Sequence, residues 1–295
     1  MSPFKSGFVG VLGQTNVGKS TFLNAVIGER LLITSPKPQT TRNRIRCIYT
    51  TEQAQIVFVD TPGLHRPRNR LSRYILRQAF RALRGLDLLL YMVEPWGEVN
   101  QYDRSLLRRL DDSKRPILLL VNKIDTAVGK ALPDTLLAYA ETGHCAELIP
   151  ISARKKTNLD EAIRTIISYL PPGKPYFPAD AKIDRKEEFL IAELIREKVF
   201  NLTKQEIPYC TAVRVKSIEP REDGLVQIQA EIIVDRSSQK GIIVGKGGRM
   251  IKEIGTMART DIESLLGAHV FLDLQVRTCK GWARDTEEIK QLTNQ

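Results

Sequence analysis

Residues 13–20 read Gly-Gln-Thr-Asn-Val-Gly-Lys-Ser, a stretch that decides the fold of the first half of the chain. It has the spacing of a phosphate-binding loop and lies between the apolar run 8–12 and the helical pattern of 21–27. Glycines let the backbone fold around phosphates, and the following helix adds the positive end of its dipole. The stretch therefore predicts a nucleotide site in which Lys19 contacts the β- and γ-phosphates and Ser20 ligates Mg²⁺.

Two further motifs follow apolar runs typical of buried strands. Residues 56–59 run into Asp60-Thr61-Pro62-Gly63, where the aspartate can hold Mg²⁺ through water and the Gly63 amide can bond a γ-phosphate. Residues 117–121 run into Asn122-Lys123-Ile124-Asp125. The Asp125 carboxylate can accept two hydrogen bonds from N1–H and the exocyclic amine of guanine, which adenine cannot supply.

The last motif is Ser152-Ala153-Arg154 after the run 148–151, where a backbone amide would meet guanine O6. Each short motif is weak alone, but the series at successive strand ends predicts a GTPase. The expected nucleotide site comprises Gly13, Gln14, Thr15, Asn16, Val17, Gly18, Lys19, Ser20, Thr21, Asp60, Thr61, Pro62, Gly63, Asn122, Lys123, Asp125, Ser152, Ala153 and Arg154.

The position that carries a water-orienting glutamine in Ras-like GTPases is Leu64 here, so slow hydrolysis by the isolated protein is expected. The adjacent His65 is a weak alternative base. In related GTPases that use K⁺, an asparagine at the place of Asn16 helps to hold the ion, although Asn16 could merely fit the tight loop. The expected catalytic residues are Lys19, Asn16, Thr41 and Gly63.

The proline-containing segment 30–41 is expected to be the first switch, where one threonine closes over Mg²⁺. Thr41 is preferred and Thr40 stays open, so the expected metal ligands are Ser20, Thr41 and Asp60.

Composition limits the remaining possibilities. The chain has 295 residues and four scattered cysteines without a Cys-x-x-Cys pair, which favours reduced thiols in a cytosolic protein. A strand pattern begins at once after the N-terminus, and no apolar run is long enough to cross a bilayer, so neither a signal peptide nor a membrane span is expected.

Residues 1–170 alternate between strand and helix patterns. Strands are expected at 7–12, 44–50, 54–60, 86–93, 116–122 and 147–151, and helices at 19–27, 70–84, 101–111, 133–142 and 159–169. The last helix has a start resembling a capping box, with Asn158 and then Glu161. This pattern predicts an α/β domain with a mostly parallel sheet and helices on both faces. The proline-rich stretch 171–180 is expected to be a semi-rigid linker.

Residues 181–295 show the order α-β-β-α-α-β, with a helix at 187–200, strands at 211–218, 225–234 and 270–277, and a helical stretch ending at 266. A Gly-Lys-Gly-Gly loop joins the two consecutive helical segments. This α+β arrangement resembles a bacterial-type (type II) KH domain, whose Gly-x-x-Gly loop clamps single-stranded RNA. The expected RNA-binding residues are Gly245, Lys246, Gly247, Gly248 and Arg249, with Ile242, Ile243, Val244 and Ile251 as an apolar floor for bases.

The net charge of +11 is concentrated in the first domain, because the residues from Asp180 onward hold 19 basic and 19 acidic side chains. Seven arginines fall between Leu64 and Leu86 with no acidic residue among them: Arg66, Arg68, Arg70, Arg73, Arg77, Arg81 and Arg84. The last five share one helical face. A solvated face is the ordinary explanation of such a stripe, but its place after the second switch favours contact with an RNA or ribosomal surface.

The order of the motifs 13–20, 38–42, 60–63, 122–125 and 245–248 resembles the Era family over essentially the whole chain. The resemblance implies a Ras-like GTPase domain that binds GTP, GDP and Mg²⁺, followed by a KH domain. It also implies binding to 16S rRNA near its 3′ end, a role in maturation of the 30S subunit, and a monomer in the cytoplasm with peripheral contact to the cell membrane. Arg154, where many GTPases carry lysine, is a mild departure.

Two alternatives remain at this level. The KH-like domain disfavours a GTPase of tRNA modification or translation. An RNA chaperone with GTP as a purely structural ligand would be separated by measuring turnover with and without RNA.

Overall fold

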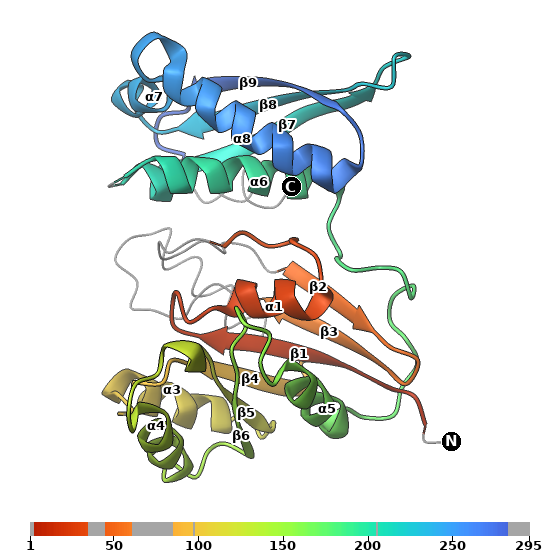
Figure 1. Ribbon diagram of the computed structural model, residues 1–295, viewed down its shortest axis with the longest axis vertical. Coiled ribbons are helices and arrows are strands. Elements are labelled where there is room, and N and C mark those ends of the chain that lie inside the picture. The colour runs from red at the N-terminus through yellow and green to blue at the C-terminus, as the bar shows by residue number, and fades with distance from the viewer. Residues whose placement is uncertain (1–2, 35–44, 61–84, 97, 205, 283–295) are drawn as a thin grey trace. The chain divides into compact units, whose positions relative to one another are not determined.

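The computed structural model describes residues 3–34, 45–60, 85–96, 98–204 and 206–282 (Figure 1). From residue 85 onward the chain forms two compact units, and the boundary between them falls between Asp184 and Arg185.

The first unit contains a six-stranded sheet in the order β2-β3-β1-β4-β5-β6. Its strands are β1 (Lys5–Gly13), β2 (Ile45–Thr50), β3 (Ala54–Asp60), β4 (Leu88–Val93), β5 (Ile117–Val121) and β6 (Glu147–Pro150). All neighbours pair in parallel except β2 and β3, which are antiparallel. The predicted mostly parallel sheet is therefore confirmed.

Helices cover both faces of this sheet (Figure 1). They are α1 (Lys19–Ile27), α3 (Gln101–Asp111), α4 (Ala131–Ala140) and α5 (Leu159–Tyr169). Successive residues of β3 contact the helices on opposite faces of the sheet, because neighbouring side chains of a strand point to opposite faces. Phe58 meets Phe22 of α1 edge to face, whereas Val59 joins the core that Leu107 of α3 and Tyr139 of α4 complete.

The strand order reverses at β1, which lies between β3 and β4. In open α/β sheets the crevice at such a reversal, at the carboxyl ends of the strands, is the ordinary ligand site. The register pairs Val11 with Asp60, so the loop after β1 and the end of β3 meet at this edge.

Residues 171–184 run along the first unit as a hydrogen-bonded strap. The Gln55 side chain of β3 accepts from the backbone N–H groups of Tyr176 (2.7 Å) and Phe177 (3.0 Å) and donates to the carbonyl of Phe177 (2.9 Å). Farther along, the N–H of Ile48 donates to the Lys182 carbonyl at 2.8 Å, so the strap covers the free edge of β2. The segment predicted as a linker is thus anchored to the sheet by a buried amide.

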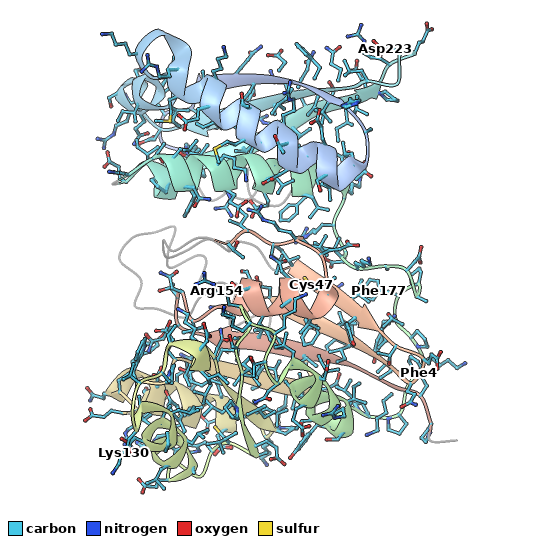
Figure 2. All side chains as sticks on the ribbon, in the orientation of Figure 1. Phe4, Cys47, Lys130, Arg154, Phe177 and Asp223 are labelled. Carbon is cyan, nitrogen blue, oxygen red and sulfur yellow. The ribbon has the colours of Figure 1, made fainter. Side chains whose placement is uncertain are left out.

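The second unit consists of α6 (Glu187–Leu202), β7 (Thr211–Pro220), β8 (Val226–Val234), α7 (Ser237–Val244), α8 (Arg249–Leu266) and β9 (Val270–Thr278), with short 3-10 turns at Ile207–Cys210 and Lys246–Gly248. Its sheet has the order β7-β8-β9, with β8 and β9 parallel. Ile195, Ile243 and Ile262 bring α6, α7 and α8 into one core with the sheet. Asp223 lies at the tip of the β7–β8 hairpin (Figure 2). The predicted α-β-β-α-α-β order is confirmed.

One local prediction is wrong. Asn158 does not cap α5 through its side chain, because its backbone is left-handed (φ 57°). Its amide instead donates to the Pro150 carbonyl at 2.9 Å, and Glu161 pairs with Arg164 at 2.6 Å. Among the described helices, none has the length and apolar character required to span a membrane.

Candidate nucleotide and RNA sites

The loop after β1 requires glycine at both ends. Gly13 has φ 143°, and a Cβ there would lie 2.4 Å from the Met92 carbonyl oxygen. Gly18 has φ 99°, and a Cβ there would lie 2.3 Å from the Asn122 side-chain nitrogen. Asn16 also lies in the left-handed region (φ 67°), which asparagine tolerates better than most residues. The loop backbone is therefore wound tightly before the first turn of α1.

Lys19 lies at the base of this loop and is only 7% exposed. Its ammonium donates to the carbonyls of Gly13 (3.2 Å) and Gln14 (2.8 Å). Burial lowers the pKa of Lys19 from 10.5 to about 8, and the negative charge of Asp60 partly opposes that shift. When a nucleotide binds, its phosphate oxygens could replace these carbonyls as partners of the ammonium and would stabilise its positive charge.

Asp60 and Ser20 supply the oxygen atoms that a hard cation prefers. Asp60 is fully buried as the last residue of β3, and Ser20 is 8% exposed at the start of α1. A buried carboxylate and a hydroxyl at the same edge of the sheet fit Mg²⁺ held by one direct ligand and by water. The described residues contain no group of three or more His, Cys, Asp or Glu side chains that could hold a metal by themselves.

Asn122 connects the loop after β1 to the predicted base-binding motifs. Its side-chain nitrogen donates to the Val17 carbonyl at 2.7 Å, and its oxygen accepts from the Ala153 N–H at 2.9 Å. Since Asn122 is 2% exposed, both bonds are shielded from water. One side chain thus ties the carboxyl ends of β1, β5 and β6 together.

The predicted base-binding residues are connected by hydrogen bonds across two loops. The Ser152 hydroxyl donates to the Asp125 carboxylate at 2.5 Å and accepts from the Lys155 N–H at 3.1 Å. Asp125 is exposed, so a guanine edge can reach this carboxylate. Lys123, with left-handed φ 65°, pairs with the Glu94 carboxylate.

The described members of the predicted site lie at the end of β1 and in the loop and first turn of α1 that follow it, at the end of β3, and directly after β5 and β6: Gly13, Gln14, Thr15, Asn16, Val17, Gly18, Lys19, Ser20, Thr21, Asp60, Asn122, Lys123, Asp125, Ser152, Ala153 and Arg154. The predicted residues Thr41, Thr61, Pro62 and Gly63 lie outside the described residues, as do Thr40, Leu64, His65 and the seven arginines.

Two acidic residues beside the site were not predicted from the sequence. Glu94 follows β4 and pairs with Lys123, while Asp103 in the first turn of α3 accepts from the Gln14 amide at 2.9 Å. Asn100 and Asp103 could have been found as a helix N-cap signal, since the Asn100 side chain accepts from the Asp103 N–H at 2.9 Å. Their connection to the phosphate loop has no local signature.

The glycine loop of the second unit lies between α7 and α8. Gly245, Gly247 and Gly248 all have positive φ (71°, 62° and 78°), which only glycine adopts freely. Lys246 and Arg249 are exposed beside them, at the N-terminal end of the 18-residue helix α8. Positive side chains and the helix dipole therefore face solvent at one loop, which suits a phosphate backbone.

The predicted apolar floor is divided between core and surface. Ile243 is fully buried and belongs to the core, whereas Ile242 is 48% exposed. A hollow of ≈ 380 Å³ between α8 and β9 is lined by Ile251, Phe271 and Arg259 among others. Phe271 is 53% exposed and offers a ring for stacking.

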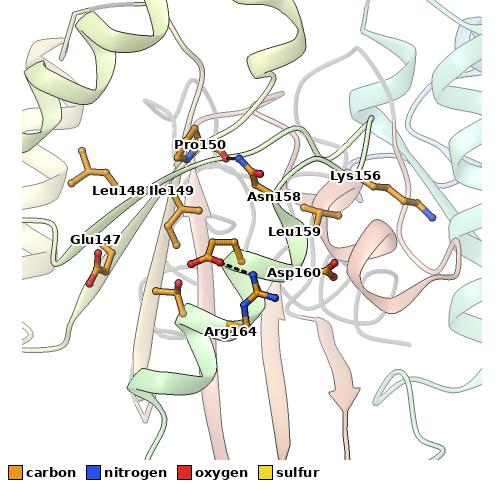
Figure 3. A pocket seen from close by; sticks show the side chains of 11 residues that line it. Glu147, Leu148, Ile149, Pro150, Lys156, Asn158, Leu159, Asp160 and Arg164 are labelled. Atoms are coloured by element: carbon orange, nitrogen blue, oxygen red, sulfur yellow. Dashed lines mark hydrogen bonds and ion pairs between the residues drawn. The ribbon is translucent and has the colours of Figure 1, made fainter.

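A second hollow, of ≈ 500 Å³, lies between β6 and α5 (Figure 3). Its lining mixes Glu147, Asp160, Lys156 and the Glu161–Arg164 pair. None of the predicted nucleotide residues lines it, so it is separate from the phosphate loop.

The two units match two known families. Residues 8–123 match the family described as 50S ribosome-binding GTPase, and residues 206–283 match the KH domain family. The chain is therefore a P-loop GTPase with a C-terminal KH domain.

Relatives that match this chain over both the GTPase domain and the KH domain identify the family more narrowly. The chain is 46% identical to GTPase Era of Geobacter metallireducens over 99% of its own length and 98% of the relative's. It is 47% identical to GTPase Era of Lacticaseibacillus paracasei over 99% and 97% of the two chains. The chain belongs to the Era family of GTPases.

Two solved structures have the same fold. A point variant of Aquifex aeolicus Era bound to GDP·AlF4⁻ superposes with a TM-score of 0.93 at 36% identity, covering 98% of this chain and 99% of that one. An Era in complex with MgGDPNP and nucleotides 1506–1542 of 16S ribosomal RNA also gives 0.93 at 36% identity, with 98% of both chains covered.

Proposed function

We propose that this GTPase binds 16S rRNA near its 3′ end through the KH domain and acts in maturation of the 30S subunit. The observation that carries the proposal is the glycine loop 245–248, flanked by exposed Lys246 and Arg249. The full-length likeness to an Era that holds nucleotides 1506–1542 of 16S rRNA supports the choice of RNA.

The loop suits single-stranded RNA for a steric reason. Without side chains at Gly245, Gly247 and Gly248, an RNA backbone can approach the peptide closely, while Lys246 and Arg249 neutralise its phosphates. Bases would extend toward the hollow between α8 and β9, where exposed Phe271 can stack.

The nucleotide site is proposed to hold GTP or GDP with Mg²⁺. Ser20 and Asp60 would hold the cation, with Thr41 as the expected further ligand, and the cation would neutralise phosphate charge. Asp125 would select guanine, and the Ser152–Arg154 segment would meet O6 through a backbone amide. Lys19, Asn16, Thr41 and Gly63 would act on the γ-phosphate, with K⁺ held by Asn16 in place of an arginine finger.

The bound nucleotide is proposed to control RNA and ribosome affinity. Linkage then requires that RNA change GTP affinity by the factor by which GTP changes RNA affinity. The protein is further proposed to act as a monomer in the cytoplasm, with peripheral contact to the inner face of the cell membrane.

In-cell crosslinking with nucleotide-resolution mapping tests the RNA assignment. The expected crosslinks cluster near the 3′ end of 16S rRNA, and Lys246→Asp with Arg249→Asp abolishes them because two charges beside the clamped phosphates are reversed. Lys204→Asp with Arg221→Asp is the matched control, since both side chains are exposed in the same unit but follow α6 and β7 rather than α7.

Crosslinks spread over unrelated RNAs, or equal losses in the two double variants, would contradict the assignment. GTP turnover is also measured with and without an RNA that contains the 3′ end of 16S rRNA. A rate that depends on this RNA indicates a regulated GTPase, and an absence of turnover indicates that GTP is only a structural ligand.

A further inference from the structure

The carboxylate of Asp103 lies in the core of the first unit, although no predicted role requires it. Asp103 is 3% exposed and occupies the first turn of α3, where the helix dipole stabilises a negative charge. The Asn100 side chain both accepts from the Asp103 N–H (2.9 Å) and donates to its carboxylate (2.6 Å). The position of Asp103 is thus fixed from its own helix.

Three further donors converge on this carboxylate from distant parts of the chain. The Tyr91 hydroxyl of β4 and the Tyr139 hydroxyl of α4 (3.0 Å) donate from the buried core. The amide of Gln14 donates to both carboxylate oxygens, at 2.9 and 3.2 Å. An ionised carboxylate only accepts hydrogen bonds, so it satisfies all four side chains at once.

Both hydroxyls keep their protons across the working pH range. Burial, reinforced by the nearby Asp103 charge, raises the pKa of Tyr91 and of Tyr139 well above the ordinary value. The two tyrosines are therefore permanent donors that hold the carboxylate in one orientation.

Of the four side-chain donors, only Gln14 belongs to the phosphate loop. The backbone carbonyl of Gln14 also accepts from the Lys19 ammonium at 2.8 Å, a shorter distance than the 3.2 Å to the Gly13 carbonyl. A continuous path of hydrogen bonds runs from Asp103 through Gln14 to the lysine that would contact the phosphates.

We propose that Asp103 is a positioning residue for GTP and GDP binding that sets the conformation of the phosphate loop through Gln14. A loop already held in its binding conformation loses less conformational freedom when the nucleotide arrives, which raises affinity. The hydrogen bonds from Tyr91, Tyr139 and Asn100 hold Asp103 in place in the core. The position of the phosphate loop is thereby fixed relative to the sheet.

Asp103→Asn tests the proposal with a nearly isosteric change. The amide nitrogen cannot accept, so the Gln14 amide and at least one hydroxyl lose a good partner. Loss of a hydrogen bond to a charged group predicts a roughly tenfold weaker affinity for a fluorescent GDP analogue. Circular dichroism and thermal unfolding report whether the variant is folded.

A double-mutant cycle separates positioning from mere stability. Gln14→Met breaks the same bond from the loop side, so adding Asp103→Asn to Gln14→Met should weaken GDP binding by less than twofold further. Tyr139→Phe is the matched control: it removes another donor to Asp103, should lower the melting temperature, and should keep GDP affinity within twofold.

Two results would overturn the proposal. One is an Asp103→Asn variant with lowered melting temperature but unchanged GDP affinity. The other is a loss of affinity that is equally large with and without Gln14→Met. If Asp103→Asn alone does not fold, the cycle is run in the Tyr139→Phe background, where one of the two hydroxyls that donate to position 103 has been removed.

Discussion

Replacing Lys19 with methionine should stabilise the nucleotide-free protein at neutral pH while it impairs nucleotide binding. The side chain keeps its length but loses a charge that is buried at 7% exposure. The pKa of Lys19 falls from 10.5 to about 8 because of that burial. At ~1.4 kcal/mol per pKa unit, keeping the ammonium charged in the folded protein costs about 3 kcal/mol.

Removing the buried charge stabilises the folded variant, but the loss of two hydrogen bonds offsets part of this stabilisation. Methionine leaves the carbonyls of Gly13 and Gln14 without the ammonium donor. At about 1 kcal/mol each, the remaining stabilisation at pH 7 is about 1 kcal/mol.

The difference in free energy of unfolding between the methionine variant and the parent should change sign as the pH rises. Between the folded pKa of about 8 and the ordinary 10.5, the unfolded chain holds a proton on Lys19 that the folded chain has released. The stability of the parent therefore rises with pH in this window, while the methionine variant lacks this contribution. Near the upper end of the window the parent should be the more stable protein by about 2 kcal/mol.

Urea unfolding of both nucleotide-free proteins, followed by circular dichroism from pH 6.5 to 10.5, measures this difference. The chain has two units, so two transitions are fitted and only that of the first unit should differ between the proteins. A pH-independent difference between the two proteins would refute the buried-charge explanation.

Three further outcomes are expected at the nucleotide site. GDP binding above pH about 8 should take up a proton, because phosphates restore the charge of Lys19 whose pKa is about 8; calorimetry in two buffers of different ionisation heat measures this, and zero uptake contradicts it. Asp125→Asn should shift preference from GTP toward XTP, since its amide offers a donor as well as an acceptor; unchanged GTP affinity with no gain for XTP would reject the base assignment. Turnover with RNA present should be faster in KCl than in NaCl at equal ionic strength, and Asn16→Ala should remove the difference; equal rates in the unmutated protein count against K⁺.

The sequence by itself determined the parts of this protein that depend on neighbouring residues. The helices 19–27, 101–111 and 159–169 were predicted with the bounds that the structure has. The phosphate loop, Asp60 and the Asn122 motif were placed at strand ends, because apolar runs and glycine spacing are local features. Parallel strands bring their carboxyl ends to one edge, so the convergence of these motifs also followed from the pattern.

Only the tertiary structure decided the partners of the polar side chains. Gln14 and Asp103 are 89 positions apart, and Gln55 and Phe177 are 122 apart, yet each pair shares a hydrogen bond. Asn158 shows the same effect at short range, because an amide that could cap a helix bonds a strand carbonyl instead. A buried polar group must find a partner, and which partner it finds depends on how the strands and helices have packed around it.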